Sequence, residues 1–229
     1  MKLLIMILAT LPAFQSFGQP DQLRTDWANL QKYAAANRAL QTPAKNEKRV
    51  VFMGDSITEG WIKADSSFFN NHPYIDRGIS GQTTPQMLVR FRPDVIALKP
   101  VAVVILAGIN DIAENTGPLP LEDVFGNIVS MAELAKTNNI RVVLCSVLPA
   151  YDFPWRRGLN PAEKVVRLNE MIEAYCRKQH IVYVDYFSKM ADERKGLPAK
   201  YAEDGIHPNP AGYRIMEELV QEGIRKALK

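Results

Sequence analysis

The chain has 229 residues, of which 47% are hydrophobic and 23% charged, and 28 Lys and Arg against 25 Asp and Glu give a formal net charge of +3. These values are typical of one folded globular domain, and they exclude a disordered chain, a collagen-like repeat, a disulfide-stapled scaffold and a multi-span membrane protein. Because the basic residues are spread along the whole chain, composition gives no argument for nucleic acid as a partner.

The N-terminus has the pattern of a signal peptide. Lys2 precedes the apolar run 3–11, and the small residues Ser16 and Gly18 suit cleavage before Gln19. The run is shorter than the ~20 apolar residues that a membrane span needs, and no Cys follows it directly, so we expect no membrane or lipid anchor. The alternative is a buried N-terminal strand or helix. We expect an exported protein, periplasmic or secreted, with residues 1–18 removed.

The segment 19–48 is expected to hold a helix and a connection that pack on a single catalytic domain, residues 49–229. Apolar residues spaced three or four apart indicate the helix. They are Leu23, Trp27, Leu30 and Ala34.

Five short runs rich in Val, Ile and Leu then alternate with helical patterns. The runs lack polar alternation, which is typical of parallel strands covered on both faces. They are residues 49–53, 74–77, 101–107, 140–146 and 181–185. Helical spacing joins Val124, Ile128, Met131 and Ala135, and again Tyr213, Met216, Val220 and Ile224, the second set preceded by Asn209 as N-cap and Pro210. This alternation predicts an α/β fold with a doubly wound parallel sheet.

Unusual polar residues follow three of these strands and precede the last helix. Ser56 comes after the first strand in Gly-Asp-Ser, Gly81 lies in the turn after the second, and Asn110 follows the third. Asp204 and His207 lie just before the final helix. Ligands of such sheets bind beyond the carboxyl ends of the strands, so we expect these residues to meet at one edge.

Together these residues supply the parts of an acyl-transfer site. Ser56 would be the nucleophile, His207 the base that takes its proton, and Asp204 the acid that orients the imidazole. The N–H groups of Ser56 and Gly81 and the amide of Asn110 would form an oxyanion hole. Each piece alone could be an ordinary turn or helix cap. Their occurrence in order at one predicted edge favours the site.

These blocks resemble the GDSL, or SGNH, hydrolase family over roughly residues 49–215. The resemblance implies a flavodoxin-like, three-layer α/β/α fold with a five-stranded parallel sheet of order 2-1-3-4-5. It also implies a Ser56–His207–Asp204 triad, with oxyanion donors at Ser56, Gly81 and Asn110, and no metal or organic cofactor. Ile57 stands where the family name has Leu. The run Gly-Asp-Ser-Ile-Thr-Glu-Gly-Trp resembles the platelet-activating-factor acetylhydrolase-like and carbohydrate-esterase branches.

The loop 148–158 is the longest irregular stretch near the predicted site. Its Tyr151, Trp155 and Arg156 are candidates for substrate binding, since aromatic rings stack on sugars and arginines contact acidic ones. The alternative is that its aromatic residues pin the loop to the body. These loop residues, together with export and the absence of an apolar lid, favour a short-chain ester, acetyl above all, on a carbohydrate. The alternatives are a lysophospholipase or thioesterase, an O-acetyltransferase, and, as the weakest, a non-catalytic glycan-binding protein.

The two cysteines are expected to be buried and unpaired. Cys145 lies in an apolar strand and Cys176 on the apolar face of a helix. Export would also permit a disulfide between them.

Overall fold

The computed structural model describes residues 26–229. Five parallel strands form one sheet in the order β2-β1-β3-β4-β5, which confirms the predicted topology. The strands match the five apolar runs to within one or two residues at each end. They are β1 (Val50–Gly54), β2 (Tyr74–Gly78), β3 (Ala102–Ile105), β4 (Arg141–Cys145) and β5 (Val182–Val184).

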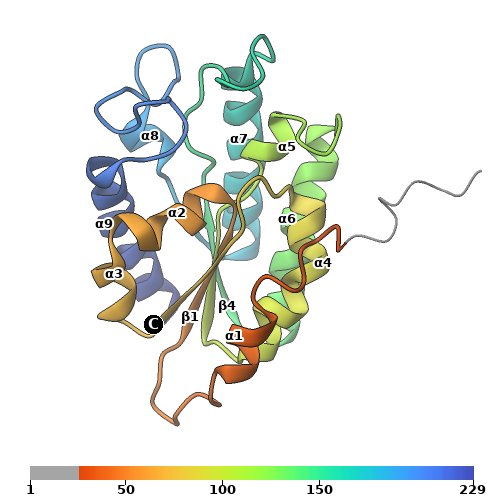
Figure 1. Cartoon of the computed structure of the whole chain (residues 1–229), viewed down its shortest axis with the longest axis vertical. Helices are drawn as coiled ribbons and strands as arrows, with labels where there is room; N and C mark the ends of the chain where they lie inside the picture. The colour runs from red at the N-terminus through yellow and green to blue at the C-terminus, as the bar shows by residue number, and fades with distance from the viewer. Residues whose placement is uncertain (1–25) are drawn as a thin grey trace, which may run out of the picture.

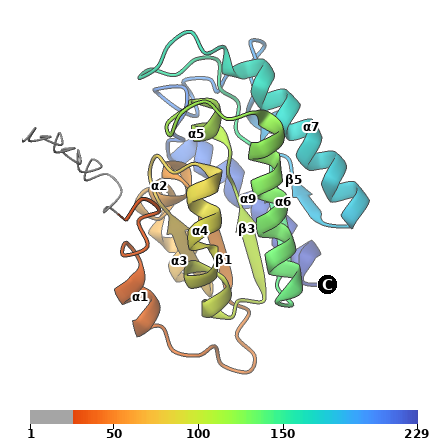
Figure 2. The same ribbon diagram turned by 90° about the vertical axis from the view of Figure 1, so that its right-hand side faces the viewer.

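Helices cover both faces of the sheet, which gives the molecule three layers (Figures 1 and 2). One face carries α2 (Ser56–Ala64), α3 (Ser66–Asn70), α8 (Phe187–Met190) and α9 (Pro210–Ala227). The other carries α4 (Thr84–Asp94), α6 (Leu121–Thr137) and α7 (Pro161–Gln179). The short α1 (Ala34–Ala39) packs outside α4, a 3-10 turn (η2, Ile96–Leu98) precedes β3, and α5 (Ile109–Ile112) follows it.

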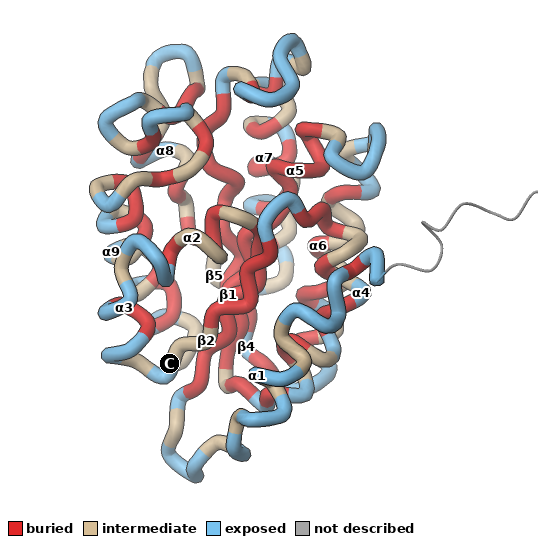
Figure 3. Tube along the Cα trace, in the orientation of Figure 1, coloured by how far each residue is buried: buried red, intermediate tan, exposed pale blue. Residues whose placement is uncertain are grey.

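The buried core runs through the sheet (Figure 3). All residues of β1 and β3 are buried, as expected for central strands covered on both sides. Beside β1, Trp61 is buried with its ring stacked on Phe68 and Tyr213, and its Nε1 donates to Glu217. Trp61 is therefore a core residue, and packing fixes α2 against α3 and α9.

The last helix begins as its sequence predicts. Asn209 is the N-cap, its Oδ1 accepting hydrogen bonds from the N–H groups of Ala211 and Gly212, and Pro210 is the first helical residue. Because α9 packs on β4 and β5, this start places the preceding 204–207 loop at the carboxyl edge of the sheet.

The predicted helix over Leu23–Ala34 is wrong in its described part. Residues 27–33 form turns, and Trp27 and Leu30 are 51% and 37% exposed. Asn29 adopts a left-handed φ of 53°, which a continuing right-handed helix does not allow. The helix α1 therefore starts only at Ala34; Leu23 and the signal-peptide pattern lie outside the described residues.

Both cysteines are buried and free, which confirms the prediction of unpaired thiols. Cys145 contacts the hydroxyl of Tyr186 at 3.6 Å. Over residues 26–229, none of the helices combines the length and the apolarity required to cross a bilayer.

Candidate active site

Ser56, His207 and Asp204 form a hydrogen-bonded series at the carboxyl edge of the sheet. Ser56 Oγ lies 3.0 Å from His207 Nε2, and His207 Nδ1 lies 2.6 Å from Asp204 Oδ2. The serine and the imidazole are 151 residues apart in sequence. The fold thus brings together three residues that the sequence had singled out separately.

Ser56 is the first residue of α2, directly after β1. Asp55 is the N-cap of this helix and accepts a hydrogen bond from the N–H of Ile57. Two glycines at the ends of β1 and β2 allow α2 to pack closely on these strands. A Cβ on Gly54 would lie 2.0 Å from Thr58 Oγ1, and one on Gly78 would lie 2.1 Å from the backbone N of Glu59. The strand-to-helix turn therefore holds the Ser56 hydroxyl at the edge with little freedom.

Asp55 is fully buried, and burial raises its carboxyl pKa to about 7. The hydrogen bond from Ile57 and the nearby His207 act in the opposite direction. Its Oδ2 has no protein partner among the described residues. Asp55 thus caps α2, and within the described residues its carboxylate makes no hydrogen bond to Ser56 or His207.

The 204–207 turn orients the imidazole. Asp204 Oδ1 accepts the N–H groups of Ile206 and His207 at 2.9 and 2.8 Å, and Gly205 supplies a φ of +76° that favours glycine. Partial burial raises the pKa of Asp204, but the hydrogen bonds from the His207 ring and backbone outweigh it and hold that pKa below its usual value. An ionised Asp204 accepts from Nδ1–H, so Nε2 is left as the acceptor for the Ser56 hydroxyl.

The sequence predicts oxyanion donors at the N–H groups of Ser56, Gly81 and Asn110. Gly81 has a left-handed φ of +77°, and neither its N–H nor that of Ser56 donates to another protein group within residues 26–229. Asn110 is buried, and its Nδ2 donates to the Gln82 carbonyl at 3.0 Å. A carboxamide carries two N–H bonds, so one of them remains for a ligand.

The sequence patterns assign no role to the neighbours of Asn110. The buried carboxylate of Asp111 accepts from both the N–H and the hydroxyl of Thr84, which ties α5 to the start of α4. Asn115 Nδ2 donates to Asn110 Oδ1. These contacts join positions 27 and 5 residues apart, and no periodicity in the sequence predicts which side chains meet there.

The loop 148–158 borders the same edge. The Trp155 ring lies 6.1 Å from the His207 ring, centroid to centroid, and is 48% exposed, while the buried Phe153 packs beneath it. Tyr151 is also exposed and lies under the guanidinium of Arg194. Arg156 Nη1 donates to the carbonyls of Ala113 and Glu114 at 2.9 and 2.6 Å, so it braces the loop that follows Asn110.

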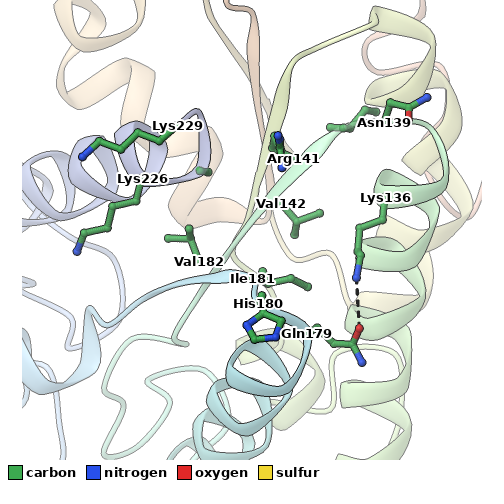
Figure 4. Close-up of a pocket in the computed structure, with 12 residues that line it drawn as sticks. Lys136, Asn139, Arg141, Val142, Gln179, His180, Ile181, Val182, Lys226 and Lys229 are labelled. Atoms are coloured by element: carbon green, nitrogen blue, oxygen red, sulfur yellow. Dashed lines mark hydrogen bonds between the residues drawn. The ribbon is translucent and has the colours of Figure 1, made fainter.

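A cavity of about 600 Å³ lies at the other end of the sheet, where β4 and β5 begin (Figure 4). Lysines, an arginine and His180 line it, and Lys136 is hydrogen-bonded to Gln179. Among the described residues that line it, no side chain carries a carboxylate, a hydroxyl or a thiol, so it lacks the side chains for acyl transfer. A smaller cavity of about 220 Å³ lies beside Asp204, bordered by Tyr151, Phe153 and Arg157.

Within the part of the chain that the structure describes, no three His, Cys, Asp or Glu side chains are grouped to hold a metal ion. The chemistry that the site offers is that of a hydroxyl, an imidazole and a carboxylate in series, with N–H donors beside them. On a parallel three-layer sheet, this arrangement defines an acyl-transfer enzyme of the hydrolase class.

Comparisons with known proteins agree with this assignment to the hydrolases. Residues 52–215 match the GDSL-like Lipase/Acylhydrolase family. A provisionally assigned acylhydrolase of Bacteroides fragilis NCTC 9343 is 52% identical, with a TM-score of 0.88 over 90% of this chain and 100% of that one. A GDSL-like lipase of Bacteroides thetaiotaomicron VPI-5482 is 54% identical, with a TM-score of 0.86 over 87% of this chain and 98% of that one.

An acetylxylan esterase of Xylanibacter ruminicola is 25% identical over 91% of this chain, which spans only 48% of that protein's length. The chain belongs to the GDSL-like lipase/acylhydrolase family, and it is an ester hydrolase.

Proposed function

We propose that this hydrolase removes short acyl groups, acetyl above all, from a carbohydrate through a covalent acyl-enzyme on Ser56. The observation that carries the proposal is the series Ser56 Oγ, His207 Nε2 and Asp204 Oδ2, with distances of 3.0 and 2.6 Å. These distances lie within hydrogen-bonding reach, which proton transfer from the nucleophile requires.

In the first half-reaction, Ser56 Oγ attacks the ester carbonyl while His207 Nε2 takes the hydroxyl proton. The tetrahedral intermediate then collapses, the C–O bond to the sugar breaks, and the same proton goes to the departing alkoxide. In the second half-reaction, His207 takes a proton from water, which attacks the acyl-enzyme. The acid is released, and Ser56 regains its proton. Asp204 stays ionised throughout and stabilises the imidazolium.

The negative charge on the intermediate's oxygen would be bound by the N–H groups of Ser56 and Gly81 and by the Asn110 amide. The first two have no other protein partner within the described residues, and Asn110 keeps one N–H free of its bond to Gln82. Donors that are already oriented cost no reorganisation when charge develops, and each is typically worth about 10²–10³ in turnover.

Two observations support a carbohydrate carrying a short acyl group. The half-exposed indole of Trp155, 6.1 Å from the His207 ring, can stack on a sugar held at the leaving-group side. The relative from Xylanibacter ruminicola is an acetylxylan esterase. Tyr151 and Trp155 are therefore the proposed sugar contacts. Arg156, committed to two carbonyls, is proposed to contact substrate only through its remaining N–H groups.

A substrate panel tests the proposal. Wild type and Ser56→Ala would be assayed on acetyl, butyryl and octanoyl esters of 4-nitrophenol, on acetylated xylo-oligosaccharides, on a lysophospholipid and on an acyl thioester. We expect acetate release from the oligosaccharide, a preference for the acetyl ester and a loss of at least about 10³ in Ser56→Ala. Retained activity in that variant would overturn the mechanism.

Other outcomes of the panel identify a different substrate. Faster cleavage of octanoyl esters or of the lysophospholipid would replace the carbohydrate assignment, and so would a preference for the thioester. Acetyl transfer to an added sugar acceptor in preference to water would make the enzyme an O-acetyltransferase. An acylated Ser56 peptide, trapped by acid quench and found by mass spectrometry, is expected in every case that uses this mechanism.

Export is part of the proposal, because an acetylated polysaccharide is met outside the cytoplasm. Its support is the apolar run after Lys2 and the small residues before Gln19. Expression in a bacterial host with the native N-terminus should give mature protein that begins at Gln19. Recovery of the uncleaved chain in the cytoplasm would argue against export.

A further inference from the structure

Asn115 lies in the loop after α5, beside two of the proposed oxyanion donors. Its Nδ2 donates to Asn110 Oδ1 at 2.9 Å and to the Gly81 carbonyl at 3.3 Å. Asn110 in turn donates from Nδ2 to the Gln82 carbonyl at 3.0 Å. One side chain therefore links the loop that carries Gly81 to the loop that carries Asn110.

These contacts determine which way each carboxamide faces. A backbone carbonyl can only accept, so the Gly81 carbonyl requires the NH₂ end of Asn115. That NH₂ group then requires the oxygen of Asn110, and the Gln82 carbonyl requires the nitrogen of Asn110. Reversing either amide would set like atoms against each other. Within residues 26–229, the only hydrogen-bonding group of the Asn110 side chain left without a partner is its second N–H, the one proposed to bind the oxyanion.

The backbone around Asn115 is braced independently of its side chain. The Asn115 N–H donates to the Asn110 carbonyl at 3.0 Å, and the hydroxyls of Thr116 and Thr83 lie 3.1 Å apart. Arg156 binds the carbonyls of the two residues before Asn115. Asn115 itself is exposed at the rim, so its side chain can be changed at little cost in folding stability.

We propose that Asn115 is a positioning residue for ester hydrolysis: it sets the amide orientation of Asn110 and holds it in register with Gly81. The inference rests on the proposed function, in which Asn110 and Gly81 bind the oxyanion. The hydrogen bond from Asn115 Nδ2 to Asn110 Oδ1 also polarises the Asn110 amide and makes its remaining N–H a better donor. The benefit is largest in the transition state, where the substrate oxygen carries charge.

Two substitutions test whether Asn115 sets the orientation of the Asn110 amide or only contacts it. Asn115→Ala removes the link between the two loops and should lower kcat about tenfold, with KM changed less than twofold. A tenfold loss corresponds to the contribution of about one hydrogen bond to transition-state stabilisation. Asn115→Asp keeps the shape but offers only acceptors. It should attract the Asn110 NH₂, turn that amide over, and present Oδ1 to the oxyanion. We therefore expect Asn115→Asp to lose more, about a hundredfold in kcat.

A double-mutant cycle shows whether Asn115 acts through Asn110. Asn110→Ala should lose about 10²–10³ in kcat, and adding Asn115→Ala to it should cause no further loss. The matched control is Asn138→Asp, an exposed asparagine at the end of α6 whose Nδ2 donates to the Leu134 carbonyl at 2.7 Å. This control should keep wild-type kcat, and all Asn115 variants should melt within a few degrees of wild type.

Wild-type kcat in both Asn115 variants, or losses that multiply with that of Asn110→Ala, would overturn the inference. So would Asn115→Asp retaining more activity than Asn115→Ala. The proposed function fails separately: it is overturned by an active Ser56→Ala or an unimpaired Asn110→Ala, whatever the Asn115 variants do.

Discussion

Of two substitutions at Asp204, the more conservative one should be the more damaging: Asp204→Asn should lose more activity than Asp204→Ala. In the structure, Asp204 Oδ1 accepts two backbone N–H groups, and Oδ2 accepts Nδ1–H of His207 at 2.6 Å. An asparagine there would keep its oxygen on the two N–H groups. Its NH₂ would then face His207 Nδ1 and require that nitrogen to be an acceptor.

The forced tautomer carries its hydrogen on Nε2. This N–H points at Ser56 Oγ, so Nε2 cannot accept the serine proton. Alanine removes the partner and leaves the ring free to adopt either tautomer. Because Asp204 and His207 are 42% and 41% exposed, water can replace the lost carboxylate in part, and solvent screens the lost charge. We expect Asp204→Ala to lose about 10² in kcat/KM and Asp204→Asn about 10³–10⁴.

The assay is hydrolysis of 4-nitrophenyl acetate between pH 6 and 9, with thermal melting as the check on folding. Asp204→Ala should melt lower than Asp204→Asn, because it leaves the N–H groups of Ile206 and His207 without their acceptor. Equal activity in the two variants, or a more active Asp204→Asn, would refute the tautomer argument.

Three further predictions concern stability and substrate binding. Burial raises the pKa of Asp76 to about 7, above the ~3.9 of an unfolded aspartate, so its contribution to stability is present in acid and is lost as the pH rises through about 7. The free energy of unfolding of Asp76→Asn, measured with urea, should therefore rise relative to that of wild type by on the order of 2 kcal/mol as the pH goes from 5 to 8. Gly78→Ala should destabilise by several kcal/mol, because its Cβ would lie 2.1 Å from the backbone N of Glu59, whereas Gly126→Ala in α6 meets nothing within 4 Å and should stabilise by about 0.5–1 kcal/mol. Trp155→Ala should raise KM for acetylated xylo-oligosaccharides about tenfold and leave 4-nitrophenyl acetate hydrolysis within twofold.

Each of these has a contradicting result. Parallel stability curves for Asp76→Asn and wild type would show that Asp76 does not titrate in this range. Similar unfolding free energies for the Gly78 and Gly126 variants would mean that the backbone at Gly78 relaxes. A Trp155→Ala variant with unchanged oligosaccharide KM would assign the indole to packing of the loop.

Local patterns succeeded wherever burial dominates. The strands β1 and β3 are buried on both faces, so their apolar runs carry an unambiguous signal. The same reasoning failed for the segment around Trp27, where the spacing suits a helix. The left-handed Asn29 and the exposed Trp27 and Leu30 show that the segment buries too little apolar surface to support one.

The sequence by itself determined the fold class, the strand order implied by its family resemblance and the residues that meet at the carboxyl edge. The fold class follows from the alternation of apolar runs, the strand order from the family resemblance alone, and the site from residue types that acyl transfer requires together. Only the tertiary structure decided how Asn110 is oriented, what Arg156 contacts and how far Trp155 lies from His207. These depend on contacts between side chains and carbonyls many residues apart, which leave no periodic trace in the sequence because each is set by the packing of separate loops.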